Sequence, residues 1–372
     1  MRRLIVCNIL LVVCSVSIMA QDYHVRVVLK DGQVVTWPVS ELEYIDFPAK
    51  GELTAKYELS LINDEVVWDS NDHSAFTCLT EWGGQKLLAF REGAAHRPTN
   101  ISDYGHITIL QESEGQWVKI EDLLHQDMDL RDPFFVEIGG NIRMYCGYNQ
   151  FVGDKYQHSG TVYSDLSDEG WSEFTPIQHD VPHITWLWKI RKYKDSFYGI
   201  GYLEGEKPVL LKSTDGIIWT TVTVFQLEGV LSEADLCFSG DSMYVCLRQD
   251  TPIGSPSHWG KSKFPFTEFE WGIMDYSVAS PELLIHPLSH QMFLAGREYD
   301  YREDKKQILV SLFEVTAERM ATKLHTFETE DLGDKGYPSM LLKDNKLYVS
   351  YYYGQGNTKI GVATFSIIEN MK

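Results

Sequence analysis

Patterns that mark several common classes of protein are missing from this sequence. Only four of its six cysteines lie beyond residue 20, and neither C-x-x-C nor H-E-x-x-H, two spacings typical of zinc sites, occurs. Positive charge is also scarce, because 33 lysines and arginines stand against 53 aspartates and glutamates, which gives a net charge of -20. This charge argues against nucleic acid or an anionic membrane surface as a partner. We expect no cofactor and no metal ion.

The cysteine contexts favour free thiols over disulfides. Cys78, Cys146, Cys237 and Cys246 all lie in apolar, strand-like stretches, where buried free thiols are common. Cys237 and Cys246 share one predicted hairpin but are out of register for a direct pair, so a disulfide between them is the weaker alternative.

Long apolar runs are absent after residue 19. Residues 1–20 begin with Met1-Arg2-Arg3 and continue with an apolar stretch that ends at Ala20, which is the layout of a cleaved secretory signal peptide. The alternative, a lipoprotein acylated at Cys14, lacks the small residue usually found before that cysteine. We expect a secreted or periplasmic protein without a membrane span, and a monomer.

Sustained apolar patterns with a helical period are missing as well. Short runs of valine, isoleucine, tyrosine and phenylalanine are separated by glycine and proline, and 13% of the residues are aromatic. This pattern predicts an all-β protein. Residues 21–50 alternate apolar and polar side chains around Asp31-Gly32, which predicts a small N-terminal β-hairpin module followed by a linker.

From residue 57 onward the chain repeats a β-hairpin and one or two further strands about every 50 residues. Equivalent positions in the second strands of these hairpins are Leu87, Ile142, Phe197, Tyr244, Phe293 and Leu347. The period predicts a six-bladed β-propeller over residues 51–372, with residues 57–68 as an edge strand that completes the last blade and closes the ring. Five or seven blades are the alternatives.

The hairpin at residues 232–250 shows how such a blade places polar side chains. Two short strands flank the turn Ser239-Gly240-Asp241-Ser242, so the start of the first strand and the end of the second lie at one edge. Glu233 and Arg248 are therefore expected side by side. The same rule brings further side chains to this rim, namely Arg91, Arg131, Asp132, Trp186 or Trp188, Arg297 and Tyr337.

Clustered guanidinium groups in a pocket indicate an anionic ligand, and a carboxylate is a common small one. Arg91, Arg248 and Arg297 are therefore predicted to bind an acidic group, with Arg131 and Asp132 close by. The alternative is that each arginine pairs with a carboxylate of a neighbouring blade and ties the ring together. Trp188 is a candidate platform for stacking a sugar ring.

Several phrases of the sequence resemble those of the sialidase superfamily, in particular its bacterial exo-alpha-sialidase-like branch. The phrases are F-R-E-G-A-A-H at 90–96, D-L-R-D-P at 129–133, S-E-A-D-L at 232–236, A-G-R-E-Y at 295–299 and G-Y-P-S-M at 336–340. Residues 212–219, K-S-T-D-G-I-I-W, resemble the Asp-box turn of sialidase-type propellers. The resemblance covers residues 57–365 and implies a glycosidase with a three-arginine anion clamp and a tyrosine nucleophile activated by a glutamate.

Carried over to this sequence, the resemblance implies that Tyr337 is the nucleophile and Glu233 its base. It implies a general acid from the loop after the first arginine, and Asp103 is the family-like choice. Alternative acids are His96 and His106 in the same loop and Asp132 in the second blade. The Arg-Ile-Pro phrase of true sialidases is replaced here by Phe90-Arg91-Glu92, which argues against sialic acid itself as the substrate.

The expected function is therefore that of a secreted glycoside hydrolase acting on a terminal, acidic sugar of a complex glycan. Two alternatives stay open. One is a non-catalytic glycan-binding propeller. The other is a polysaccharide lyase on uronic acids, in which arginine would neutralise the carboxylate and tyrosine or histidine would move protons.

Overall fold

The computed structural model describes residues 24–28, 34–38, 56–152, 155–182, 186–203, 205–301, 307–327, 329 and 333–370. The chain divides into two compact units, Met1–Thr54 and Ala55–Lys372. In the first unit, β1 (His24–Val28) and β2 (Val34–Pro38) form the antiparallel pair expected on either side of Asp31-Gly32. The Asp31-Gly32 turn, the predicted signal peptide and Cys14 lie outside the described residues.

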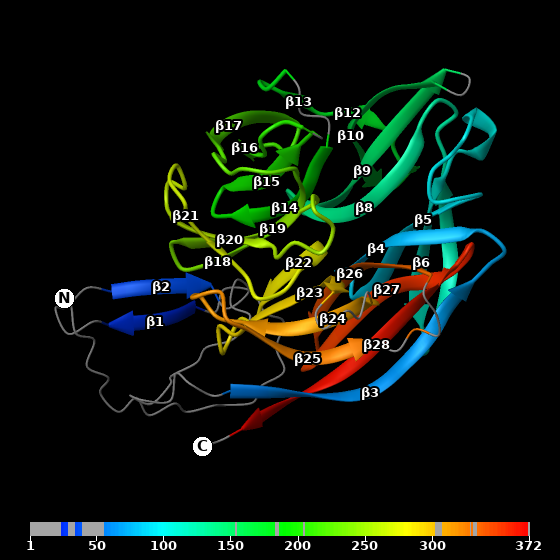
Figure 1. Cartoon of the computed structure of the whole chain (residues 1–372). Coiled ribbons are helices and arrows are strands. Elements are labelled where there is room, and N and C mark those ends of the chain that lie inside the picture. The colour runs from blue at the N-terminus through cyan, green and yellow to red at the C-terminus, as the bar shows by residue number, and fades with distance from the viewer. Residues whose placement is uncertain are drawn as a thin grey trace. The chain divides into compact units, whose positions relative to one another are not determined.

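The second unit is built from β-sheets, and its described residues contain no α-helix (Figure 1). Four of its sheets are separate units of four or five strands, antiparallel except where noted. One holds β8 (Asp129–Ile138), β9 (Asn141–Val152), β10 (Lys155–Ser167), β11 (Gly170–Trp171) and β12 (Thr175–Pro176). The next holds β14 (Trp186–Tyr193), β15 (Ser196–Tyr202), β16 (Val209–Ser213), β17 (Ile218–Val224) and, in parallel with β17, β13 (Gln178–His179).

The other two separate sheets have four strands each. One contains β18 (Leu231–Ser239), β19 (Ser242–Gln249), β20 (His258–Lys263) and β21 (Glu270–Ile273). The other contains β22 (Val278–Ile285), β23 (Met292–Asp300), β24 (Gln307–Val315) and β25 (Ala321–Phe327). In the first of these, Ser239 pairs with Ser242 across the turn, so the predicted hairpin at residues 232–250 is confirmed.

The remaining strands of the second unit form one eight-stranded sheet. They are β26 (Asp334–Lys343), β27 (Lys346–Gln355), β28 (Asn357–Asn370), β3 (Lys56–Asp69), β4 (His73–Trp82), β5 (Gln85–Gly93), β6 (His106–Ser113) and β7 (Gln116–Leu123). As predicted, β3 pairs with β28 and so joins the start of this unit to its end. A parallel contact of Thr358 with His73 links β28 to β4.

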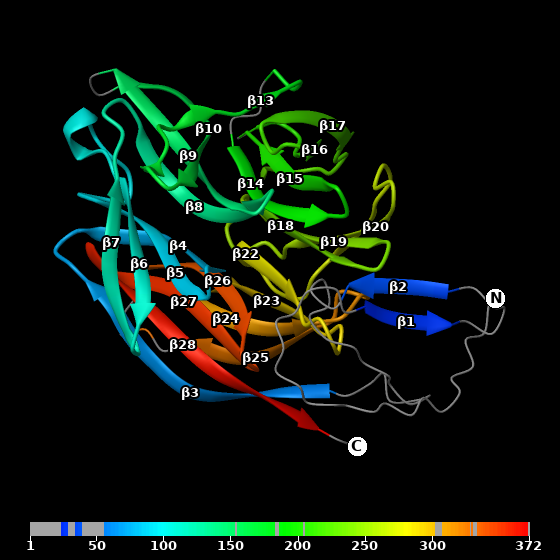
Figure 2. The ribbon, with the colours of Figure 1, turned by 180° about the vertical axis from the view of Figure 1, so that it is seen from behind.

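The propeller-like arrangement of the sheets is confirmed, but six separate blades are not found. Among the described residues, four blades are separate, and the single sheet stands where two further blades were expected. The reason is the contact between Thr358 and His73, which makes the strands on either side of it one hydrogen-bonded sheet. In Figures 1 and 2 the strands β4, β8, β14, β18, β22 and β26 come together in the middle of the unit, and each contacts the next around a closed ring.

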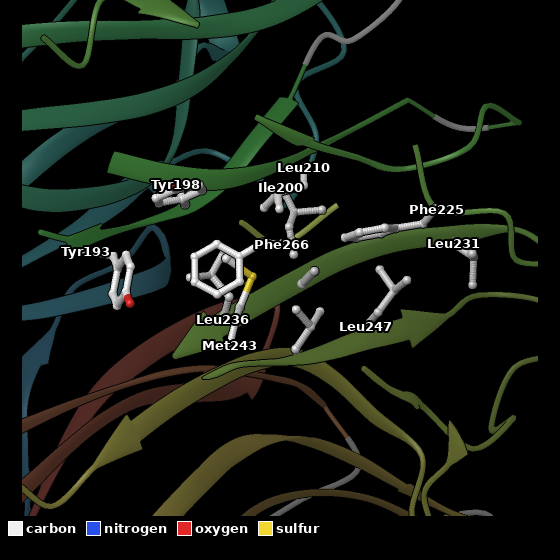
Figure 3. Close-up of a cluster of buried hydrophobic side chains, with 12 residues drawn as sticks. Tyr193, Tyr198, Ile200, Leu210, Phe225, Leu231, Leu236, Met243, Leu247 and Phe266 are labelled. Carbon is white, nitrogen blue, oxygen red and sulfur yellow. The ribbon is translucent and has the colours of Figure 1, made fainter. Parts of the chain in front are cut away.

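The hydrophobic core lies between neighbouring sheets. Figure 3 shows one such cluster, in which Tyr198 and Ile200 of β15 pack against Leu236 of β18 and Met243 of β19, with Phe266 inserted between them. Because successive side chains of a strand point to opposite faces, a sheet packed between two others needs apolar residues on both faces. Seven successive residues of β18 are buried, from Leu231 to Cys237. Leu236 packs in the cluster with β15 and Cys237 in the cluster with β22 and β23, so apolar side chains lie on both faces, whereas the buried Ser232, Glu233 and Asp235 are polar.

The four described cysteines are buried and free, as predicted. Burial raises the pKa of the Cys146 thiol well above its ordinary value, and it raises the pKa values of Cys78, Cys237 and Cys246 as well. These thiols are therefore protonated and act as small apolar side chains. No helix in the described part of the chain has the length and apolarity to cross a bilayer.

The turn resembling an Asp-box has the expected geometry. Asp215 Oδ1 accepts hydrogen bonds from the backbone N–H groups of Ile217 and Ile218 at 2.8 and 2.9 Å. Trp219 is completely buried and donates from its indole nitrogen to the carbonyl of Gly216 at 3.0 Å. The motif joins the outer strands β16 and β17, so it stabilises a blade.

Candidate active site

Each inner strand of the second unit is interrupted by a β-bulge near its start. The described strands β4, β8, β14, β18, β22 and β26 all shift register there. The residues at the shifts are Phe76-Thr77, Asp132-Pro133, Lys189, Ser232-Glu233, Ser280-Pro281 and Tyr337-Pro338. A bulge redirects a side chain and ends regular pairing, and such bulges are frequent next to active sites.

Backbone strain coincides with these bulges. Phe76, Asp132, Lys189, Ser280 and Tyr337 have φ angles of 63°, 45°, 42°, 44° and 47°. A residue other than glycine in this left-handed region costs on the order of 1–3 kcal/mol and persists where the surroundings impose it. The repetition of this strained geometry around one centre points to a site built for function.

Five of these six bulges, all except Ser232-Glu233, contribute residues to the lining of a cavity with about 340 Å³ of empty space, part of which is open solvent. Its lining combines aromatic and polar side chains, among them Phe76, Asp132, Trp186, Trp188, Ser280 and Tyr337. Asp132, Trp186, Trp188 and Tyr337 were predicted at this rim from their places at the starts of inner strands. A small, partly apolar cavity with a few convergent polar groups is the usual form of a ligand site.

Tyr337 and Glu233 form the central pair of the site. The Tyr337 hydroxyl donates a hydrogen bond to Glu233 Oε1. Glu233 is 4% exposed, and its Oε2 accepts from Arg248 Nη1 at 2.7 Å and from the backbone N–H of Ser280 at 2.6 Å. The predicted neighbours Glu233 and Arg248 thus meet, and the carboxylate is fixed with one oxygen toward the tyrosine.

The protonation states follow from these contacts. Burial favours the neutral form of Glu233, but the charge of Arg248 and the hydrogen bonds from Tyr337 and Arg248 outweigh it and lower its pKa. Burial, followed by the negative charges of Glu233 and Asp132, raises the pKa of Tyr337 well above its ordinary value. The pair therefore consists of an ionised carboxylate and a protonated phenol.

Arg248 and Arg297 both lie near Tyr299. The Cζ atom of Arg248 is 6.0 Å from the Tyr299 ring centroid, and Nη1 of Arg297 is 3.5 Å from its hydroxyl. The guanidinium of Arg297 also lies 5.4 Å from the centroid of the Tyr337 ring. Two arginines of the predicted clamp therefore flank the central pair.

Both arginines already have carboxylate partners. Arg248 Nε lies 2.6 Å from Asp250 Oδ1, in addition to its contact with Glu233. Arg297 Nη2 contacts Asp334 Oδ1 at 2.8 Å and the Tyr352 hydroxyl at 2.9 Å. The two arginines therefore pair with protein carboxylates, as the alternative interpretation of the sequence expected, and their binding of an acidic ligand stays a prediction.

No protein-family model matches the sequence, and no curated protein matches it. Solved structures do match. The Trypanosoma rangeli sialidase superposes with a TM-score of 0.57 at 8% identity, over 79% of this chain and 55% of that one.

Two further sialidases match over a larger share of their own length. The endosialidase of phage phi92 gives a TM-score of 0.61 at 8% identity, over 85% of this chain and 70% of that one. The NanB sialidase of Streptococcus pneumoniae gives 0.59 at 8% identity, over 82% and 70%. The chain has the sialidase-like β-propeller fold. It spans little more than half the length of the Trypanosoma rangeli enzyme.

The position of Arg91 in this sialidase-like propeller corrects its predicted role. Its side chain is completely buried, and its Nε and Nη2 contact Asp129 Oδ1 at 3.1 and 2.7 Å. Gly93 and Gly105 press on the guanidinium so closely that a Cβ at Gly105 would lie 2.3 Å from Arg91 Nε. Arg91 therefore holds the first-blade loop to β8 and is closed off from ligands.

Asp103 is also corrected as the general acid. It ends the short 3-10 turn Ile101–Asp103, where its Oδ2 accepts from the Thr99 hydroxyl at 2.5 Å and from the Asn100 amide at 3.1 Å. The Thr99 hydrogen bond is the main cause of a lowered pKa, so Asp103 is ionised and has no proton to donate. His106 contacts Glu92 and Asp122 at 3.9 and 3.7 Å, and it is not among the residues that line the cavity.

Asp132, the alternative acid, lines the cavity. Its Oδ1 and the indole nitrogen of Trp188 are buried and have no hydrogen-bond partner within the described residues. Burial, opposed mainly by the charge of Arg131, raises the pKa of Asp132 to about 7. The Trp188 ring centroid lies 5.6 Å from that of Tyr337, and Asp132, Trp188 and Tyr337 all line the cavity. Buried polar atoms without partners indicate groups that a ligand satisfies.

Two residues near this cavity, His73 and Asp334, have no counterpart in the sequence interpretation. Asp334 Oδ2 contacts His73 Nε2 at 3.2 Å and His96 Nδ1 at 2.6 Å. The His96 carbonyl accepts from Arg131 Nη1 at 2.7 Å, and the Arg131 guanidinium lies 4.7 Å from the Phe76 ring centroid. The available signal was positional, since His73 and Asp334 are the first residues of the inner strands β4 and β26.

Proposed function

We propose that this protein is a retaining glycoside hydrolase that cleaves a terminal, acidic sugar from a glycan. The observation that carries the proposal is the hydrogen bond from the Tyr337 hydroxyl to Glu233 at the edge of the cavity. The sialidase-like fold supports the proposal, because the three sialidases compared above match 79% to 85% of this chain. Fold likeness alone does not assign chemistry, so the proposal depends on the pair.

In the first step Glu233 takes the phenolic proton while Tyr337 Oη bonds to the anomeric carbon. The bond from that carbon to the glycosidic oxygen breaks, and the oxygen leaves with the electron pair and receives a proton from Asp132. A tyrosine suits a sugar whose anomeric carbon bears a carboxylate, because a neutral nucleophile avoids the repulsion that an aspartate or glutamate would meet. Glu233 is ionised in the resting site, so it is ready to act as the base.

In the second step the carboxylate of Asp132 takes a proton from water, whose oxygen bonds to the anomeric carbon. The bond to Tyr337 Oη breaks, and the phenolate recovers its proton from Glu233. Two displacements on the same carbon give retention of configuration. Each proton lost in the first step is thus returned, and the site regains its starting state.

Arg248 and Arg297 are proposed to bind the acidic group of the sugar. Within the described residues, the hydrogen bond of Arg297 Nη1 is a long one of 3.5 Å to the Tyr299 hydroxyl, and the Arg297 guanidinium lies beside the Tyr337 ring. Forked guanidinium donors recognise a carboxylate well. Trp188 and Phe76 supply apolar surface next to Tyr337.

A panel of fluorogenic glycosides tests the proposal. Nonulosonic and hexuronic acid glycosides are compared with matched neutral hexosides, and near-ultraviolet absorbance of the products is followed at the same time. The proposal expects release of the fluorophore from one class of acidic glycoside without new absorbance. A rise in absorbance would indicate a lyase, and binding without any product would indicate a glycan-binding propeller.

The acid role of Asp132 predicts how activity depends on pH. Its pKa of about 7 means that it is protonated below that value and loses its proton above it. Therefore kcat/KM is expected to fall tenfold for each pH unit above about 7. Asp132→Asn is expected to remove this alkaline limb and to lower kcat by roughly 10²- to 10⁴-fold on substrates with poor leaving groups. The measurement is the pH profile of kcat/KM for both proteins.

A leaving group that needs no protonation separates acid catalysis from binding. Asp132→Asn is expected to retain most of its first-step rate on an aryl glycoside with a strongly acidic phenol. Ser232→Ala is the matched control. It removes the buried Ser232 hydroxyl, which like Asp132 Oδ1 has no hydrogen-bond partner in the described structure, and it should keep the wild-type pH profile. An unchanged alkaline limb in Asp132→Asn would remove Asp132 from the mechanism.

We also propose that the eight-stranded sheet is two blades, which gives a ring of six. The strands β26 to β28 and β4 to β6 pack their apolar faces together through residues such as Tyr352 and Phe90, as separate blades do elsewhere in the unit. The signal-peptide pattern of residues 1–20 supports a further proposal, that the protein acts outside the cytoplasm.

A further inference from the structure

The cluster of His73, His96 and Asp334 is not used by the proposed mechanism. Its members come from three separate segments, the start of β4, the loop after β5 and the start of β26. One nitrogen of each histidine and one oxygen of the aspartate lie within 4.8 Å of one another. Chain segments far apart in sequence thus bring together three atoms that bind metal ions well.

We propose that this histidine–aspartate cluster is a binding site for a divalent transition-metal ion, with Zn²⁺ as the best match. Two imidazole nitrogens and one carboxylate oxygen form a ligand set used by zinc sites that keep a fourth position open for water or substrate. Calcium and magnesium prefer oxygen ligands, so the two histidines select against them.

The contacts of Asp334 orient it for this task. Arg297 Nη2 holds Oδ1 at 2.8 Å, which leaves Oδ2 directed at both histidines. Such a partner behind a ligating carboxylate is the usual way in which proteins fix a metal ligand. Around a zinc ion the ligand atoms stand roughly 3.3 Å apart, given bond lengths of about 2.0–2.1 Å. The contacts to Oδ2 of 2.6 and 3.2 Å therefore need to widen by less than about 1 Å.

The cluster is accessible, and it adjoins the cavity. The side chains of His96 and Asp334 are 37% and 31% exposed, whereas that of His73 is 5% exposed. The rings of His96 and Phe76 are 5.4 Å apart, and those of Phe76 and Tyr337 are 4.6 Å apart. A bound ion would add positive charge beside Arg297 and so favour an acidic sugar. This last consequence rests on the proposed function, whereas binding of the ion does not.

Calorimetric titration of the tag-free, chelator-treated full chain with ZnCl₂ tests the site. We expect one ion to bind per chain. His96→Ala and Asp334→Asn are each expected to weaken this binding at least about 10- to 100-fold, which is the range measured for the loss of supporting residues around metal sites. His125→Ala, in the loop after β7, is the matched control and should bind Zn²⁺ as the wild type does.

Anomalous diffraction from wild-type crystals soaked in ZnCl₂ gives a second readout that needs no variant. The expected peak lies between His73, His96 and Asp334. A flat titration, equal affinity in the wild type and both cluster variants, or an anomalous peak at another place would overturn the site. None of these readouts depends on hydrolysis. Failure of the metal-site proposal can therefore be distinguished from failure of the hydrolase proposal.

Discussion

Replacing Tyr337 with phenylalanine is expected to lower kcat by roughly 10⁴-fold, because the variant lacks the atom that attacks the sugar. The aromatic ring is kept, so its contacts with Phe76 at 4.6 Å and with Trp188 at 5.6 Å are retained. Glu233 keeps its hydrogen bonds from Arg248 and Ser280. Steady-state kinetics on the best acidic glycoside, with a thermal melt of each protein, measures the effect.

The matched control for this change is Tyr193→Phe. The Tyr193 hydroxyl donates to Asp241 Oδ1 at 2.6 Å on a turn of the neighbouring sheet, and it has no place in the proposed chemistry. We expect wild-type kinetics from this variant. Retention of more than about a tenth of the wild-type kcat in Tyr337→Phe would show that Tyr337 is not the nucleophile.

Replacing Arg91 with methionine is expected to lower the free energy of unfolding by about 3 kcal/mol. The change leaves the completely buried carboxylate of Asp129 without its main cationic partner. Asp129 retains a hydrogen bond from the Gly105 N–H at 2.7 Å and a contact with Arg131 at 3.3 Å, so the loss falls at the low end for a broken buried pair. Denaturant unfolding of both proteins measures it.

A second substitution separates charge from packing. In Arg91→Met/Asp129→Asn the buried negative charge is removed while the acceptor for Gly105 remains, so part of the lost stability should return. A large increase in KM without loss of stability would instead restore Arg91 to the anion clamp. The two roles of this arginine thus give opposite patterns.

The sequence predicted the parts of the site that follow from local pairing. Glu233 and Arg248 belong to one hairpin, so antiparallel geometry alone brings their side chains together. Tyr337 and Asp132 each precede a proline at the start of an inner strand, and both line the cavity. The contact of Tyr337 with Glu233 is different, because it joins β26 to β18, and it was expected from the family resemblance and not from local pairing.

The failures concern side-chain partners that the strand pattern does not indicate. Arg91 occupies the expected place at the end of a second strand, but its side chain forms an ion pair with Asp129 of the next sheet. Asp103 was favoured by its place in a loop, yet hydrogen bonds from Thr99 and Asn100 keep it ionised. Sequence position gives the edge on which a side chain lies, whereas the nearest partner decides what it does there.

The bulges explain why the cavity itself was not predictable in detail. Each inner strand changes register near its start, and five residues there have positive φ angles although none is glycine. Local preferences disfavour this conformation, so only the packing of neighbouring sheets can impose it. The joining of two expected blades into one sheet was also not predictable from local preferences. It depends on a contact between Thr358 and His73, which lie near opposite ends of the unit's sequence.

Trapping the covalent intermediate tests directly whether Tyr337 is the nucleophile. The full chain is incubated with a fluorinated, activated analogue of the acidic sugar that it releases fastest, then digested and mapped by mass spectrometry. If Tyr337 is the nucleophile, a sugar adduct is expected on its hydroxyl in the wild type and none in Tyr337→Phe. An adduct on Asp132 or Glu233, or turnover with inverted configuration and no adduct, would contradict it.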